Sequence, residues 1–137
     1  MTSQGAVIRM PRRVKSALAV VWLQAVMNAL VAWVFIDAAD TYTEHGVGDR
    51  YDAGLLRSLG YFSILFALLL GGCAVLAAVR RSGGLRHVLT GVEALVVLGA
   101  LVGLFSGGGM PCVAAIVLSA VVAKQFASAE GRAWFSQ

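Results

Sequence analysis

Charged residues are scarce in this chain of 137 residues: they make up 13% of the sequence, and only seven residues are acidic. An ordinary soluble domain has about 25% charged and about 45–50% apolar residues, whereas 59% of this chain is hydrophobic. A chain this short has too much surface relative to its volume to hide such an excess in one core. The composition excludes an ordinary water-soluble domain and predicts one folding unit whose apolar surface faces lipid.

Cysteine, histidine and proline occur only twice each. Cys73 is expected toward one end of the second apolar segment, and Cys112 at the opposite end of the fourth. Their separation in depth, roughly 20 Å or more, excludes a bridge between them, since disulfide Cα atoms lie about 4.4–6.8 Å apart. His45 and His87 lie outside the centres of the apolar segments, which argues against haem held between helices. We expect no metal or other cofactor.

Catalytic motifs are absent as well. The chain contains no phosphate-binding glycine loop, no HExxH and no nucleophile elbow. The apolar segments hold too few polar groups for the acid, base or metal ligands that an active site needs. The sequence predicts a protein that is not an enzyme.

Long apolar runs are present instead. A helix that crosses the hydrocarbon needs roughly 20 mostly apolar residues, within a range of about 17–25. Four segments qualify, namely 16–36, 55–79, 87–105 and 111–126, and the last is expected to continue as helix as far as Trp134. An outer loop (37–54), an inner loop (80–86), a glycine-rich turn and a C-terminal tail (127–137) complete the chain. Short connections make consecutive helices antiparallel neighbours, so we expect an all-α, antiparallel bundle of four transmembrane helices.

The basic residues predict the orientation. One side of the expected bundle receives only Arg50 and Arg57, and the other receives Arg9, Arg12, Arg13, Lys15, Arg80, Arg81, Arg86, Lys124 and Arg132. The positive-inside rule assigns the second side, with both termini, to the cytoplasm. The net charge of +4 therefore indicates membrane topology and not a nucleic-acid partner. Abundant Ala, Val, Gly and Arg suggest a bacterial chain in the plasma (inner) membrane.

Small residues mark the expected helix contacts, because helices in lipid associate by close packing. Gly60 and Gly71 lie on one stripe of the second span, and Gly99 and Gly103 are four residues apart in the third. The second pair is typical either of a homodimer seam or of contact within one bundle, and the latter is favoured. Trp134 and Phe135 are expected in the aromatic belt at the inner membrane interface.

Glu93 is the only carboxylate well inside a predicted span, where a charge costs about 2.5–3.5 kcal/mol on insertion scales. Counting outward from the turn between the third and fourth spans places Lys124 at the same depth. We therefore predict a Glu93–Lys124 ion pair that sets helix register, unless Lys124 extends to the headgroups. The alternative makes Glu93 a proton or cation site of a small transporter.

The other polar groups have simpler interpretations. Gln24 and Asn28 lie four residues apart and share a helix face, which favours hydrogen bonding between helices over a polar pathway. The acidic residues of the outer loop match no calcium-binding pattern and are expected to be solvated, with Arg57 paired to Asp37 or Asp52.

Two functions remain open on the sequence. The first is a non-enzymatic accessory, assembly or immunity-type subunit that binds another membrane protein. It explains the missing motifs, the short loops and the small-residue faces. The second is a homo-oligomeric transporter or channel that uses Glu93, Gln24 and Asn28.

Overall fold

The computed structural model describes residues 9–45, 52–105 and 109–136. Within these ranges the chain forms five helices and no strand: α1 (Arg12–His45), α2 (Ala53–Val79), α3 (Gly83–Phe105), α4 (Gly109–Ala127) and α5 (Ala129–Phe135). The first four, of 34, 27, 23 and 19 residues, are long and apolar enough to cross a bilayer. The prediction of an all-α protein with four candidate spans is confirmed, and the chain is a multi-pass membrane protein.

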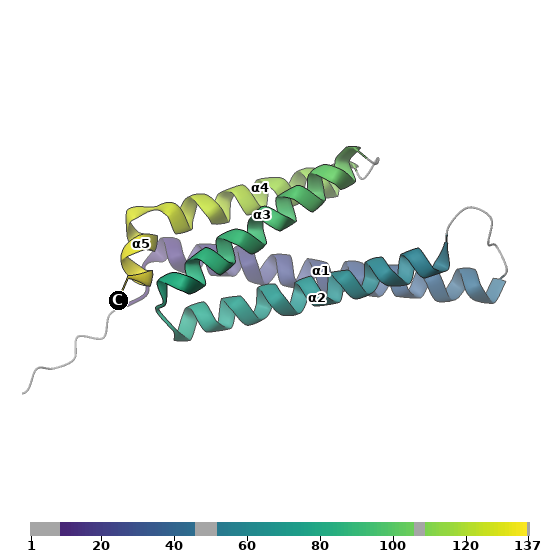
Figure 1. Ribbon diagram of the computed structural model, residues 1–137, viewed down its shortest axis with the longest axis horizontal. Coiled ribbons are helices and arrows are strands. Elements are labelled where there is room, and N and C mark those ends of the chain that lie inside the picture. The colour runs from purple at the N-terminus through teal and green to yellow at the C-terminus, as the bar shows by residue number, and fades with distance from the viewer. Residues whose placement is uncertain (1–8, 46–51, 106–108, 137) are drawn as a thin grey trace, which may run out of the picture.

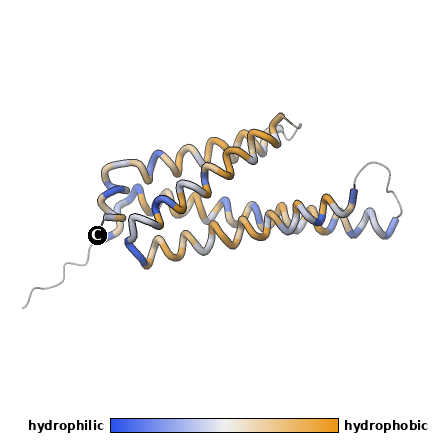
Figure 2. The backbone as a smooth tube through the Cα atoms, in the orientation of Figure 1, coloured by the Kyte–Doolittle hydropathy of each residue, from blue (hydrophilic) through white to orange (hydrophobic). Residues whose placement is uncertain are grey.

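A bilayer explains why these segments are helical. Hydrocarbon contains no water to satisfy the backbone, so each N–H and C=O must find its partner within the segment. Apolar residues make up most of the four long helices, and polar residues are frequent at the helix ends, with a few inside the helices (Figure 2). In the most apolar window of each helix only 17–22% of the residues are buried inside the protein. The remaining side chains face outward and need lipid around them.

The long helices form two hairpins, α1 with α2 and α3 with α4 (Figure 1). Gly60 of α2 lies against Ala32 and Ile36 of α1, and Gly71 lies against Trp22, so residue numbers run in opposite directions along this pair. A Cβ atom on Gly60 would lie 2.7 Å from Ile36 Cγ1 and 3.2 Å from the Ala32 carbonyl oxygen. The missing side chain of Gly60 therefore permits the close approach of α1 and α2.

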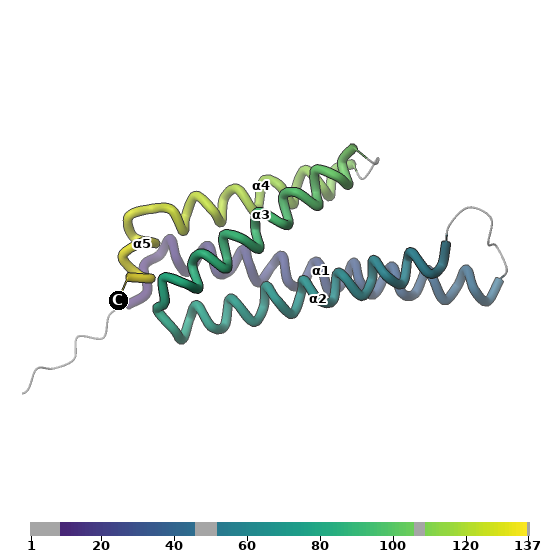
Figure 3. The backbone as a smooth tube through the Cα atoms, viewed as in Figure 1, coloured from purple at the N-terminus to yellow at the C-terminus, as the bar shows by residue number. Residues whose placement is uncertain are grey.

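The two hairpins meet at one end of the molecule and diverge toward the other (Figures 1 and 3). We call the shared end the basic end, because Arg13, Arg80, Arg86, Lys124 and Arg132 lie there, and the opposite end, which carries Asp37, Asp40, Glu44 and Asp52, the acidic end. One buried apolar cluster joins all five helices near the basic end, and its members are Val14, Ala17, Leu18, Val21, Ala25, Leu70, Cys73, Ala74, Ala77, Leu89, Val92, Val122, Phe126, Trp134 and Phe135.

The half of the α3–α4 hairpin nearer the acidic end contributes little to this core. The last buried residue of α3 is Glu93, and the first buried residue of α4 is Ser119. Beyond these two positions, the described residues of the hairpin are all at least partly exposed. The hairpins are therefore held together at the basic end and open at the other.

α1 continues nine residues past the predicted end of the first span at Ile36. The prediction of a loop over 37–54 is therefore wrong for 37–45, which belong to α1, and for 53–54, which belong to α2, while 46–51 lie outside the described residues. The hydroxyls of Thr41 and Thr43 donate to carbonyls one turn back, at 2.9 and 2.7 Å. Polar side chains are tolerated here because a 34-residue helix, at 1.5 Å per residue, is about 51 Å long and extends beyond about 30 Å of hydrocarbon.

An ion pair at the acidic end joins Arg57 of α2 to Asp40 of α1, with 2.7 Å between Nη2 and Oδ1. The predicted pairing of Arg57 with Asp37 or Asp52 is wrong. The helical extension of α1 carries Asp40 to the level of Arg57. Asp52 is instead the N-cap of α2 and accepts a hydrogen bond from the backbone N–H of Gly54 at 2.8 Å.

The two remaining connections are shorter than expected. α3 begins at Gly83, four residues before the predicted start, so that only 80–82 separate α2 from α3. The Ser82 carbonyl accepts from the backbone N–H groups of Leu85 and Arg86, which starts the helix early. α4 begins at Gly109 and places Pro111 in its first turn, where the missing N–H of proline costs no hydrogen bond. The turn residues 106–108 lie outside the described residues.

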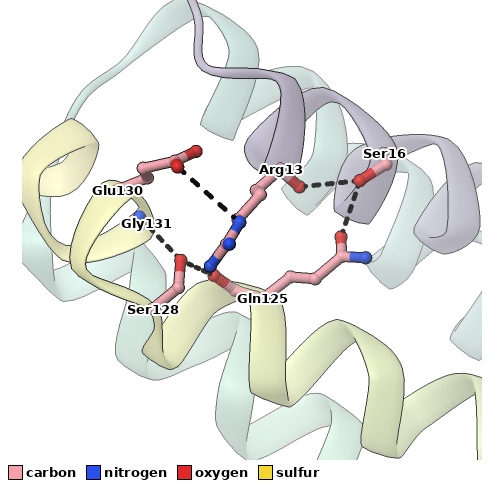
Figure 4. Close-up of polar contacts among 6 residues, drawn as sticks. All are labelled: Arg13, Ser16, Gln125, Ser128, Glu130 and Gly131. Atoms are coloured by element: carbon pink, nitrogen blue, oxygen red, sulfur yellow. Dashed lines mark hydrogen bonds and ion pairs between the residues drawn. The ribbon is translucent and has the colours of Figure 1, made fainter.

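α4 ends at Ala127 and does not run on to Trp134 as predicted. The Ser128 hydroxyl donates to the Gln125 carbonyl at 2.6 Å and accepts from the Gly131 N–H at 3.1 Å, so it ends one helix and caps the next (Figure 4). A Cβ atom on Gly131 would lie 2.7 Å from the carbonyl oxygens of Gln125 and Phe126. Glycine therefore allows α5 to fold tightly against the end of α4.

Trp134 and Phe135 of α5 are buried, which corrects their predicted place in a lipid-facing belt. Trp134 Nε1 donates to the Ala77 carbonyl at 3.5 Å, and the Arg81 guanidinium lies 4.2 Å from a Trp134 ring centroid. Phe135 contacts Phe126 edge to face, with 5.6 Å between centroids. These apolar, cation–π and aromatic contacts close the basic end of the bundle.

The close approach at Gly60 can be tested with a matched glycine from the same helix. We expect Gly60→Ala to lower the free energy of unfolding by about 1–3 kcal/mol, because the new methyl group overpacks the α1–α2 contact. Gly72 has no atom within 4 Å of an added Cβ, so Gly72→Ala should be neutral or stabilising by up to about 1 kcal/mol. Reversible unfolding in mixed micelles, followed by helical circular dichroism, measures both, and equal effects would contradict the assigned contact.

Candidate functional site

Three polar side chains from three helices meet inside the bundle. Gln24 of α1 donates through Nε2 to Glu93 Oε2 of α3 and to Ser119 Oγ of α4, both at 3.1 Å. Gln24, Glu93 and Ser119 are 4%, 1% and 1% exposed. We call these residues the polar cluster. It joins the first hairpin to both helices of the second.

Each member of the polar cluster occupies the buried face of its helix. α1 buries Val21 and Ala25 beside Gln24, and α4 buries Val122 three residues after Ser119. Residues three and four apart share one helix face, so the helical period that places apolar residues in the core places these polar ones there too. Their burial is a consequence of helix register, and hydrogen bonds between them must replace the missing water.

The hydrogen bonds of the polar cluster are incomplete. Gln24 Oε1 and Glu93 Oε1 are both buried and have no hydrogen-bond partner among the described residues. The described ion pairs do not include Glu93, so no described cation offsets a charge on it. Burying an ionised carboxylate without a cation is costly in hydrocarbon. The Gln24 amide is therefore the described group that contacts the Glu93 carboxyl group.

The predicted ion pair between Glu93 and Lys124 is not formed. Glu93 and Ser119 lie at similar depth, because both contact the Gln24 side chain. Ser119 precedes Lys124 by five residues. Five residues correspond to about 7.5 Å along a helix and to about 140° of rotation. Lys124 is consequently exposed near the basic end. The distance of each residue from the turn between α3 and α4 predicts its depth in the membrane. It does not predict which face of α4 the residue occupies.

Gln24 and Asn28, predicted to act together, have different surroundings. Gln24 bonds across helices, whereas Asn28 Nδ2 donates to the Gln24 carbonyl of its own helix at 2.9 Å. Asn28 is half-buried and lines a groove between the hairpins. One residue therefore belongs to the core and the other to a surface that a ligand can reach.

The groove has a volume of about 390 Å³ and lies on the side of the polar cluster toward the acidic end. All four long helices line it, and we call it the hairpin groove. Its lining residues are Asn28, Val31 and Phe35 of α1, Leu59, Phe62, Ser63 and Phe66 of α2, Leu95, Val96, Gly99 and Ala100 of α3, and Pro111, Cys112 and Ala115 of α4. It is the space left where the hairpins diverge.

The predicted glycine contacts are used in different ways. Gly103 packs within its hairpin, since an added Cβ would lie 2.9 Å from Cys112 Sγ of α4. Gly99 has nothing within 4 Å of such a Cβ and opens onto the hairpin groove. Gly71 makes only ordinary contact with Trp22, at 3.7 Å. Of the two glycines in α3, the first (Gly99) is therefore an open position and the second (Gly103) a packed one.

Cysteine and histidine do not assemble a site in the described part of the chain. Cys73 is buried and Cys112 half-buried, and both are free. His45 is exposed at the end of α1, and His87 is exposed in the first turns of α3. Among the described residues no three His, Cys, Asp or Glu side chains gather into a group that could hold a metal ion.

Ser119 is the site residue that sequence reasoning did not single out. From the sequence, Ser119 is predicted only to be a small packing residue between Ala115 and Ala123 of the fourth span. Its place three residues before Val122 and seven before Phe126 puts it on the buried face of α4. That spacing is a weak signal, because serine is also common at helix contacts that carry no polar site.

The chain matches no protein-family model, and no curated protein and no solved structure is detectably similar to it. The polar cluster and the hairpin groove are therefore the features from which a function can be inferred. A fold by itself would not supply one, since function resides in particular sites.

The polar cluster predicts unequal effects for two neighbouring substitutions. Gln24→Leu should lower the free energy of unfolding by about 1–2 kcal/mol, because it leaves buried acceptors of two helices without a donor. Asn28→Leu removes one bond within α1 and should cost less than about 0.5 kcal/mol. Unfolding by SDS titration in mixed micelles compares the two variants. A larger loss for Asn28→Leu would show that Gln24 is not the joining residue.

Proposed function

We propose that this chain is a non-enzymatic subunit of a membrane protein complex and that its hairpin groove receives a transmembrane helix of another membrane protein. The proposal places the chain in the plasma membrane of a bacterium, with the basic end toward the cytoplasm as the positive-inside rule predicts. The observation that carries it is the divergence of the two hairpins, which leaves the hairpin groove open among four helices.

The lining of the hairpin groove favours a helix as occupant. Gly99, Ala100 and Ala115 line it from α3 and α4, and small residues let helix backbones approach closely. The open space beside Gly99 contrasts with the filled positions at Gly60 and Gly103. A partner helix with its own small residues could pack closely in the half of the molecule nearer the acidic end. Helix packing would then continue from the basic end along the whole bundle.

Asn28 adds a polar group to this apolar lining. Its Nδ2 donates to the Gln24 carbonyl, and its side-chain oxygen remains available as an acceptor. A partner helix carrying a Ser, Thr or Asn hydroxyl or amide would donate to it, and such bonds between helices contribute about 0.6–2 kcal/mol. The expected partner face is therefore small and apolar with one donor.

Site-directed crosslinking in membranes of the source cell tests this occupant. A photoreactive amino acid at Val31, inside the hairpin groove, should join the chain to one polypeptide of defined mass. The same amino acid at Val75, which is exposed on α2 and does not line the groove, should not. Gly99→Leu should abolish the Val31 crosslink by filling the space that the partner helix occupies.

Gly72→Leu is the matched control for the blocking variant, since Gly72 is also a helical glycine with open space around it but lies outside the groove. This variant should retain the crosslink. Lipid adducts alone, or a product of twice the chain mass, would contradict a helix of another protein as the occupant. A crosslink that persists in Gly99→Leu would place the partner elsewhere.

The second candidate function is a small homo-oligomeric transporter that uses Glu93. The observation that favours it is the buried, unpartnered Oε1 of Glu93, since ionisable residues inside membranes often mark proton pathways. Asn28 leads from the hairpin groove to Gln24, and Gln24 contacts Glu93. Binding and release of one proton at Glu93 would then couple to passage of a substrate through the groove.

Proton flux into reconstituted vesicles tests this candidate. If it is correct, a pH gradient should produce flux with the natural chain, and Glu93→Gln should reduce it to the level of empty vesicles. Glu130→Gln provides the control, because Glu130 is exposed on α5 and contacts Arg13 at 3.6 Å, away from the polar cluster. Absence of flux with the natural chain would eliminate the transporter, as would equal flux in Glu93→Gln.

A further inference from the structure

A second cavity lies at the basic end, between α3, α4 and α5. Its volume is about 280 Å³, and it is lined by Arg86, His87, Thr90, Ala123, Phe126, Ala127 and Arg132. We call it the basic pocket. It is separate from the hairpin groove, with which it shares no lining residue.

Two arginines, Arg86 and Arg132, line the basic pocket, and no acidic residue is among its lining residues in the described part of the chain. Neither Arg86 nor Arg132 forms an ion pair with a carboxylate in the described part of the chain. The nearest acidic residue in sequence to Arg132, Glu130, faces Arg13 instead at 3.6 Å (Figure 4). Like charges that line one cavity repel each other, so an anionic ligand would relieve the repulsion.

The basic pocket lies where two of the apolar candidate spans begin and end. Arg86 and His87 lie near the start of α3, and Ala123 and Phe126 lie near the end of α4, where two apolar spans begin and end at the same level. Phe126 is almost completely buried and forms an apolar wall. In a bilayer that α3 and α4 cross, the cavity would place cations next to an apolar surface at the level where headgroup phosphates begin.

We propose that the basic pocket binds the phosphate of an anionic phospholipid, with Arg86 and Arg132 as its ligands. Guanidinium groups donate paired hydrogen bonds to phosphate oxygens, and basic pockets between transmembrane helices are suited to anionic headgroups. The volume is just below the roughly 300–1,000 Å³ of sites for drug-sized ligands. It suits a headgroup phosphate whose acyl chains lie outside, along α3 and α4.

Lipid retention by the purified full-length chain tests this site. The chain in neutral detergent is mixed with phosphatidylglycerol or phosphatidylcholine, and bound lipid is counted by native mass spectrometry. The natural chain should retain phosphatidylglycerol preferentially. The double variant Arg86→Gln, Arg132→Gln should weaken that binding by about 25-fold, because each cation lost near an anionic lipid costs about fivefold in affinity.

Arg9→Gln with Arg12→Gln is the matched control, because it removes two exposed arginines from the basic end outside the pocket. This control should bind phosphatidylglycerol within about twofold of the natural chain, as expected for charges that make no direct contact. Equal losses in the two double variants would indicate diffuse attraction and overturn the site. No preference for phosphatidylglycerol in the natural chain would overturn it as well.

Two further measurements keep the outcome interpretable. Helical circular dichroism and thermal unfolding establish that the variants are folded, and Arg132→Gln alone, on an exposed side chain, should still weaken binding by about fivefold. Inorganic phosphate is the other probe. Binding of inorganic phosphate as tight as that of phosphatidylglycerol would assign the pocket to a soluble anion and refute the lipid.

Discussion

The Gln24 amide is the polar contact on which the arrangement of the bundle depends, because it bonds to both helices of the other hairpin at once. In lipid there is no hydrophobic force between apolar helices, so packing and hydrogen bonds must determine which faces meet. One side chain that donates to Glu93 and Ser119 sets the rotation of three helices relative to one another. The apolar cluster around it fills the same end of the molecule.

Contacts between the hairpins are concentrated in the half of the molecule nearer the basic end. Ser16 donates to Gln125 at 2.9 Å, and Arg13 faces Glu130 (Figure 4). α5 adds buried aromatic side chains against α2 and α4. Close-packed protein interiors deform little. This closed half therefore holds the two hairpins at the angle that creates the hairpin groove. Because the contacts between the hairpins lie near the basic end, the bundle is closed there and open near the acidic end.

The molecule thereby separates three environments that a membrane protein can use. The polar cluster is sealed from water and lipid, the hairpin groove is apolar and open among four helices, and the basic pocket lies where the spans end. The polar cluster holds hydrogen bonds between helices. The hairpin groove is the place that we propose for a partner helix, and the basic pocket is the place that we propose for an anionic headgroup. Arg57 and Asp40 pair at the far end, outside this division, where exposure limits the contribution of the ion pair to stability.

Composition and helical period alone predict the four spans, their order and the residues that need partners, because a chain in hydrocarbon must satisfy its backbone within each segment. They predict Gln24 and Glu93 as polar residues of the interior, and Gly60 and Gly103 as contacts. They do not predict that Glu93 meets Gln24 and Ser119 rather than Lys124, that Gly99 opens onto a groove, or that Ser128 turns α5 back over the bundle. Those outcomes depend on the rotation and tilt of whole helices, and many packings of four apolar helices satisfy the same local pattern. Only the tertiary structure selects one, because the contacts that distinguish them join residues distant in sequence.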